Sequence, residues 1–194
     1  MSKTSEKPSI FVTRRWPDAA EEALKQHFRP TFNEDDVPLT ASQIADGFAN
    51  HDALAPTVSD QITSDIIAAG AAGSGRLIAN YGVGVNHIDL SAAVSAGLAV
   101  SNTPGVLTDA TADLTLALML MVSRRAGEGE RELRAGEWHG WRPTHLMGRS
   151  LSGKTLGIIG MGRIGKAVAY RAALGFGMKI IFINLNLLFP NFKI

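Results

Sequence analysis

An α/β protein with parallel sheets is the fold class that this sequence predicts, on three observations. Residues 154–184 read KTLGIIGMGRIGKAVAYRAALGFGMKIIFIN, in which an apolar run, a glycine turn, a helical pattern and a second apolar run follow one another. Short apolar runs also alternate with helical patterns through residues 9–101, as strands joined by helical crossovers do. Finally, 45% of the 194 residues are hydrophobic and 19% are charged, which is typical of a chain that buries a core.

The composition also excludes several classes of protein. The net charge of +1 gives no indication of a nucleic-acid partner or of an anionic membrane surface. The chain has no cysteine, so disulfides and thiolate metal sites are excluded, and a reducing cytoplasm is the predicted location. The first residues are polar, unlike a signal peptide, and the apolar stretch at 114–122 is too short to span a bilayer. We expect a soluble, cytoplasmic chain.

Strands and helices alternate in the first part of the chain. Strands are predicted at residues 9–13, 29–33, 52–58, 76–81 and 98–101, and helices at 17–28, 40–48, 59–68 and 90–96. Pro17 opens the first helix, and Thr40 or Ser42 opens the second. Gly97 stands where a glycine commonly ends a helix.

Residues 102–105, with Pro104 and Gly105, are predicted to cross between two lobes. The helix predicted at 108–125 is apolar on nearly every side, which indicates burial on more than one face. A subunit interface and a deep position within a domain both explain this pattern, and the sequence does not decide between them. Residues 128–149 predict a short helix followed by an extended arm.

The glycine turn has the spacing G-x-G-x-x-G between a strand at 155–159 and a helix at 163–174, with a second strand at 178–183. Gly160 permits the tight turn, Gly162 lets a pyrophosphate approach the main chain, and Gly165 lets the helix pack closely on the strand. The first N–H groups of the helix, at Arg163 and Ile164, then face an anion. This strand–turn–helix context favours dinucleotide binding.

Two alternatives compete with dinucleotide binding. Gly160 and the pair Gly165-Lys166 have P-loop spacing, but Ala167 cannot supply the hydroxyl that a P-loop needs for magnesium. A glycine-tolerant corner that binds nothing is the other alternative. No metal site is predicted.

Three blocks of sequence resemble the D-isomer-specific 2-hydroxyacid dehydrogenases, most of all the glyoxylate/hydroxypyruvate reductase branch. They are NYGVGVNHIDLSAAVSAGLAVSNTPGVLTDATADLTLALMLMVSRR, the arm with GEWHGW, and LSGKTLGIIGMGRIGKAVAYRAALGFGMKII. The resemblance implies a flavodoxin-like substrate lobe at residues 1–103, followed by the start of a Rossmann dinucleotide-binding domain at residues 104–194. It also implies NAD or NADP as cofactor, a small 2-oxo acid as substrate, and a homodimer in the full-length family.

The resemblance also assigns roles to individual residues. Backbone N–H groups of Val83 and Gly84 would hold the substrate carboxylate, and Thr111 would lie near the nicotinamide. Arg163 and Ile164 would hold the pyrophosphate, and Asn184 stands where the family carries an acidic or basic residue for the ribose.

The family's catalytic Arg, Glu and His would fall after Ile194, so no catalytic residue is assigned. His139 and His145 lie in the arm and are interpreted as surface or interface residues, and His87 as a loop residue. The apolar residues after Asn184 depart from the family pattern, which is typical of a truncated or frame-shifted gene. We therefore expect an inactive N-terminal fragment with about two strands of a six-stranded cofactor sheet. A catalytically dead dimerisation partner and a gene remnant are the alternatives.

Overall fold

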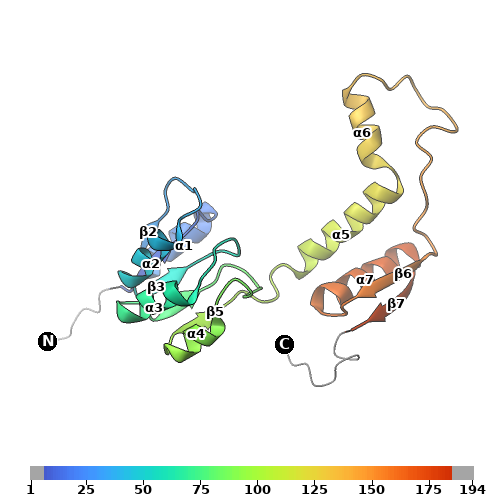
Figure 1. The fold of residues 1–194 in the computed structure, drawn as a ribbon. Coiled ribbons are helices and arrows are strands. Elements are labelled where there is room, and N and C mark those ends of the chain that lie inside the picture. The colour runs from blue at the N-terminus through green and yellow to red at the C-terminus, as the bar shows by residue number, and fades with distance from the viewer. Residues whose placement is uncertain (1–6, 185–194) are drawn as a thin grey trace. The chain divides into compact units, whose positions relative to one another are not determined.

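The computed structural model describes residues 7–184, and the chain divides into two compact units, Met1–Pro104 and Gly105–Ile194 (Figure 1). The first unit carries a five-stranded sheet in the order β2-β1-β3-β4-β5, and every neighbouring pair in it is parallel. This is the strand order of flavodoxin-type doubly wound folds. Its strands are β1 (Ser9–Val12), β2 (Arg29–Phe32), β3 (Ala53–Ala55), β4 (Leu77–Ala79) and β5 (Ala99–Ser101). Its helices are α1 (Asp18–His27), α2 (Ala41–Ala49), α3 (Ser64–Ala72) and α4 (Leu90–Ser95).

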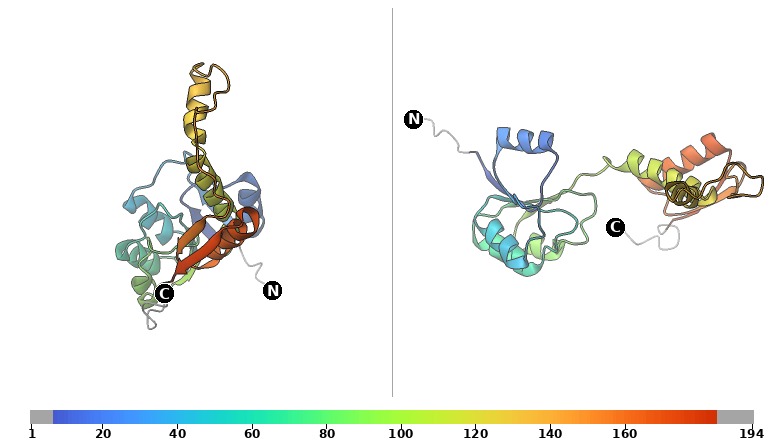
Figure 2. Two further views of the ribbon diagram at one scale, coloured as in Figure 1. Left: turned by 90° about the vertical axis from the view of Figure 1, so that its right-hand side faces the viewer. Right: turned by 90° about the horizontal axis from the view of Figure 1, so that it is seen from above.

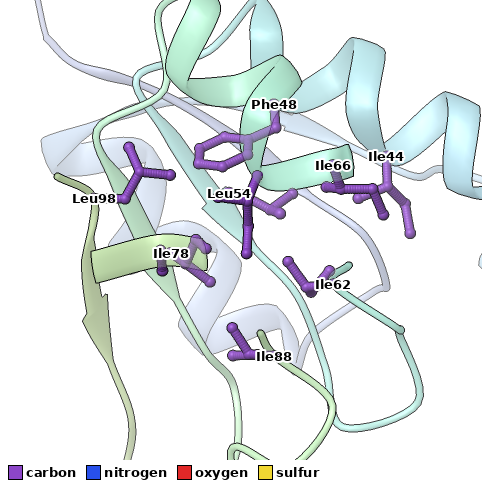
Figure 3. Packing of buried hydrophobic residues seen from close by; sticks show 10 residues of the cluster. Ile44, Phe48, Leu54, Ile62, Ile66, Ile78, Ile88 and Leu98 are labelled. Carbon is purple, nitrogen blue, oxygen red and sulfur yellow. The ribbon is translucent and has the colours of Figure 1, made fainter. Parts of the chain in front are cut away.

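Helices cover both faces of this sheet, with α1 on one face and α2, α3 and α4 on the other (Figure 2). The strands supply an apolar set to each face because successive side chains of a strand point to opposite sides. Ile10, Val12, Ala53 and Ala55 form one buried cluster. The larger cluster, which includes Leu54, lies among the other three helices (Figure 3). Its buried members are Ile44, Phe48, Leu54, Ile62, Ile66, Ile67, Ile78, Ile88, Ala93 and Leu98.

The predicted helix at 59–68 is wrong at its start, because α3 begins at Ser64. The buried carboxylate of Asp60 stabilises a turn that precedes the helix. It accepts the Thr13 hydroxyl at 2.6 Å and the Thr57 backbone N–H at 2.8 Å. These bonds hold the chain in a turn after β3, so helical geometry begins only beyond it.

In its described residues, the second unit contains three helices and a two-stranded parallel sheet. Its elements are α5 (Thr108–Ser123), α6 (Ala126–Arg134), β6 (Thr155–Ile159), α7 (Arg163–Phe176) and β7 (Lys179–Ile183). Its buried apolar cluster joins α5 to α7 and to the start of β7, and its members are Ala112, Leu116, Val168, Ala172 and Met178. Arg171 on α7 reaches Asp109 at 2.9 Å and Asp113 at 2.6 Å, both on α5.

Two further expectations for this unit need correction. The helix α7 extends beyond the predicted residue 174 to Phe176, and Gly177 ends it in the left-handed region with φ 59°. The helix α5 is not buried deep within a domain, since Ala112 and Leu116 are its buried residues while Leu114 and Val122 are 59% and 80% exposed. Its second apolar face has no cover in the described part of the chain.

Between residues 7 and 184, no helix is both long enough and apolar enough to cross a membrane.

Candidate functional site

The loop Gly82-Val83-Gly84 follows β4 at the carboxyl edge of the first sheet, the edge at which open α/β sheets bind ligands. Two asparagine side chains hold its carbonyl groups. The Asn80 amide nitrogen donates to Gly82 O at 3.2 Å and to Gly84 O at 2.9 Å. The Asn102 amide nitrogen donates to Val83 O at 2.8 Å.

Two N–H groups of the same loop are available to bind a ligand. Those of Val83 and Gly84 have no acceptor among residues 7–184. In a turn, successive free N–H groups can form an anion-binding concavity. Beside them lies a hollow of about 360 Å³, lined by Val58, Gln61, Gly84, Asn86 and His87. The loop can therefore hold a small anion, such as a carboxylate.

His87 is tied into this loop rather than free to act on a ligand. Its Nε2 lies 2.9 Å from the side-chain oxygen of Asn80. Burial lowers the pKa of His87, and the Asp60 carboxylate partly opposes that shift. The ring is therefore neutral over a wider pH range than an exposed histidine.

The glycine turn of the second unit joins β6 to α7, and a different physical reason explains the glycine at each of its three positions. Gly160 has φ 95°, which L side chains rarely adopt. A Cβ added at Gly165 would overlap Gly160 O, so only glycine lets the helix start lie this close to the strand. A Cβ added at Gly162 would meet nothing within 4 Å. The fold itself does not require glycine at 162, whereas the close approach of a ligand to the main chain would.

The start of α7 has donors without protein partners. No side chain caps it, and the N–H groups of Arg163 and Ile164 have no acceptor in the described part of the chain. The positive end of the helix dipole adds to their attraction for an anion. Gly162, open to solvent, leaves the space from which a diphosphate could reach them.

Asn184 lies beside this turn. Ile159 and Ile183 are paired in the parallel sheet, and Gly160 N donates to Ile183 O at 2.9 Å. The structure thus brings Asn184 and the glycine turn to one sheet edge. Thr111 is half-buried in α5, and no hydrogen bond between described residues links it to the turn.

Of the two arm histidines, His145 contacts a carboxylate of helix α6. His145 Nε2 lies 2.8 Å from a carboxylate oxygen of Glu132, and Arg142 contacts both residues. Sequence reasoning missed Asn80 and Asn102 as residues that hold the Gly82–Gly84 loop. The only signal was their place directly after strands β4 and β5, at the ligand-binding edge of the sheet.

Comparisons with known proteins agree with this architecture. Residues 116–188 match the family model of the D-isomer specific 2-hydroxyacid dehydrogenase, NAD binding domain. The chain is 41% identical to a glyoxylate reductase of Korarchaeum cryptofilum over 92% of this chain and 53% of that protein. A solved structure from Polaromonas, assigned to the D-isomer specific 2-hydroxyacid dehydrogenases, is 42% identical with a TM-score of 0.85, over 91% of this chain and 55% of that one.

A third relative carries a bound cofactor. The NADPH-dependent glyoxylate/hydroxypyruvate reductase of Sinorhizobium meliloti, solved with NADP and malonate, is 30% identical with a TM-score of 0.75. It is matched over 91% of this chain and 53% of its own length. The chain spans about half the length of the curated relatives it matches.

A parallel α/β sheet with loops open at its carboxyl edge, together with a glycine turn between two parallel strands, is typical of doubly wound, nucleotide-binding α/β folds. The chain belongs to the D-isomer-specific 2-hydroxyacid dehydrogenase family.

Proposed function

We propose that this chain forms the carboxylate-binding lobe and the pyrophosphate-binding turn of an NAD(P)-dependent dehydrogenase that reduces a small 2-oxo acid to the D-2-hydroxy acid. Glyoxylate and hydroxypyruvate are the proposed substrates, since relatives 41% identical to this chain, from Korarchaeum cryptofilum and Thermococcus litoralis, are named glyoxylate reductases. Residues 1–103 are the proposed substrate lobe and residues 104–194 the proposed NAD(P)-binding domain.

The observation that carries the proposal is the open main chain at Gly162. Of the three glycines in the turn, Gly162 alone is required neither by its φ nor by packing. NAD(P)H, when bound, supplies the hydride. Arg163 and Ile164 N–H groups would hold its pyrophosphate, and the neutral Asn184 amide would bond to ribose hydroxyls or to a 2′-phosphate.

In the first unit, Val83 and Gly84 N–H groups would hold the substrate carboxylate. Two N–H donors match the two oxygens of that group. The hollow of about 360 Å³ beside them has room for an acid of two or three carbons. Substrate orientation, rather than proton transfer, is the role proposed for this loop.

We propose that the chain by itself binds these ligands but does not turn them over. Reduction of a ketone builds negative charge on its oxygen, and a proton donor within hydrogen-bond reach typically contributes ~10²–10⁴-fold in rate. His87 bonds to Asn80, and His145 lies against Glu132. Neither histidine is therefore placed to donate a proton to the substrate.

A second candidate function is self-association, favoured by the exposed apolar face of α5. Leu114, Leu118, Met121 and Val122 are between 47% and 80% exposed on this helix. An apolar stripe of this kind typically packs on another protein surface. In this proposal a second copy of the chain covers it.

The test is isothermal titration calorimetry, in which NADH or NADPH is titrated into the full chain. Gly162→Val should weaken binding at least about tenfold, because a branched side chain fills the space that the phosphates need. The unfolding midpoint should stay close to that of the parent, since nothing lies within 4 Å of the added Cβ.

The matched control is Gly175→Val, which adds the same side chain at an equally open position of α7. Equal affinity of the parent and Gly162→Val would rule out the proposed pyrophosphate seat. Oxidation of NADH by the parent chain with glyoxylate would contradict the binding-only proposal.

A further inference from the structure

We propose that Asn80 is a positioning residue, whose buried side chain fixes the Gly82–Gly84 loop so that its N–H groups face a substrate carboxylate. The inference rests on the proposed function, which names that carboxylate as the ligand.

The first step is the geometry of the peptide groups. In a planar trans peptide, the carbonyl and the N–H point in opposite directions. Asn80 holds Gly82 O at 3.2 Å, so the Val83 N–H of the same peptide group points away from Asn80. Asn102 holds Val83 O and acts in the same way on the Gly84 N–H. The two asparagines thus orient the two candidate donors, one each.

The second step is the saturation of the Asn80 amide. An amide nitrogen carries two hydrogens, and both are used here, on the carbonyl groups of Gly82 and Gly84. The side chain is 2% exposed, so water cannot replace these bonds cheaply. Asn80 therefore closes the loop at both of its ends.

The third step is the orientation of that amide. A reversed amide would place its oxygen against two carbonyl oxygens, which repel it. With the nitrogen facing the loop, the Asn80 oxygen faces His87 Nε2 at 2.9 Å and accepts a hydrogen bond from it. The proton of His87 therefore resides on Nε2 in the neutral ring. His87 fixes Asn80, and Asn80 fixes the loop.

The fourth step separates positioning from ordinary structural bonding. Asn33 makes the same kind of bridge elsewhere in this unit, donating to Thr13 O at 2.9 Å and to Val37 O at 2.7 Å. Its loss removes two amide–carbonyl bonds without touching the Gly82–Gly84 loop. Asn33→Ala is therefore the matched control for Asn80→Ala.

The experiment combines nitrogen-15 NMR relaxation with a glyoxylate titration of the full chain. In Asn80→Ala, the order parameter of the Val83 amide should fall from about 0.85 to below about 0.6. Glyoxylate binding, followed by the Val83 and Gly84 amide shifts, should weaken about tenfold. Asn33→Ala should lower the unfolding midpoint by a comparable amount and leave both readouts at their parental values.

A second pair of variants covers the case in which Asn80→Ala does not fold. His87→Leu removes the donor to Asn80, and His87→Gln retains a donor. We expect weaker glyoxylate binding in His87→Leu and recovery in His87→Gln.

The outcomes separate this inference from the function on which it rests. Parental glyoxylate affinity together with an ordered Val83 amide in Asn80→Ala overturns the positioning role alone. A parent chain whose Val83 and Gly84 shifts do not respond to glyoxylate overturns the proposed ligand. In that case the order of the Val83 amide in Asn80→Ala still decides whether Asn80 holds the loop.

Discussion

Replacing Gly165 by alanine should destabilise the second unit, although alanine is the better helix former. The added Cβ would overlap Gly160 O, with Gly160 C at 3.2 Å and Ile158 Cγ2 at 3.4 Å. The overlapping atom is backbone, so it cannot rotate away as a flexible side chain would. The start of α7 has to move from β6 by roughly 1 Å to restore ordinary contact distances.

The magnitude follows from two opposing effects. Overpacking of this kind costs ~1–3 kcal/mol. The gain in helix propensity from glycine to alanine is at most ~1 kcal/mol. Because the clash is with backbone, we take the upper part of the overpacking range, ~2–3 kcal/mol, and expect a net loss of ~1–2 kcal/mol. Gly175→Ala, in the same helix but in open space, should instead stabilise by ~0.4–1 kcal/mol.

Amide hydrogen exchange in β6 and α7 is the appropriate assay because it reports on this unit alone. Exchange should be about 5–30 times faster in Gly165→Ala, since 1–2 kcal/mol corresponds to that factor. It should be slower than the parental rate in Gly175→Ala. Slower exchange in both variants would show that propensity outweighs contact at Gly165 and would refute the packing argument.

Two further predictions concern the Asp52 carboxylate of the first unit and the exposed face of α5. The Ser9 hydroxyl and backbone N–H, both at 2.7 Å, lower the pKa of Asp52 against the opposing effect of burial. The carboxylate therefore stabilises the fold above the ordinary aspartate pKa of about 3.9, and this contribution is lost as the pH falls through the lower folded pKa. Unfolding midpoints of the parent and Asp52→Asn should differ at pH 7 and converge at low pH; a constant difference would contradict the assignment. On α5, Val122→Glu should reduce self-association, measured by sedimentation velocity. The control Val94→Glu, at a similarly exposed position of α4, should not reduce it. Equal sedimentation of both variants and the parent would argue against the α5 interface.

Much of the first sheet could be predicted from the sequence because its strands are short apolar runs separated by helical patterns. All five predicted strands in residues 9–101 have a counterpart in the structure. The start of α3 could not be predicted, since the Asp60 carboxylate that delays it bonds to Thr13, a residue 47 positions away. Local patterns carry no information about such a partner.

The candidate sites divide in the same way. The glycine turn could be predicted because φ and packing restrict residue type at Gly160 and Gly165, and the restriction leaves its mark on the sequence. The part played by Asn80 could not, because an asparagine after a strand has no preferred partner until the loop closes on it. The uncovered face of α5 is a third case, since the sequence shows that side chains are apolar but not what covers them.

The connectivity of the first sheet also bears on synthesis at the ribosome. Its last strand ends at Ser101, so every strand of that sheet has been made before the 90 residues of Gly105–Ile194 follow. At ~5–20 residues per second, those 90 residues take roughly 5–20 s to translate, whereas domains of this size commonly fold within seconds. The Gly82–Gly84 loop and the asparagines that hold it can thus be in place while the glycine turn is still being translated. The nascent chain would then display the proposed carboxylate-binding surface before the proposed pyrophosphate-binding one exists.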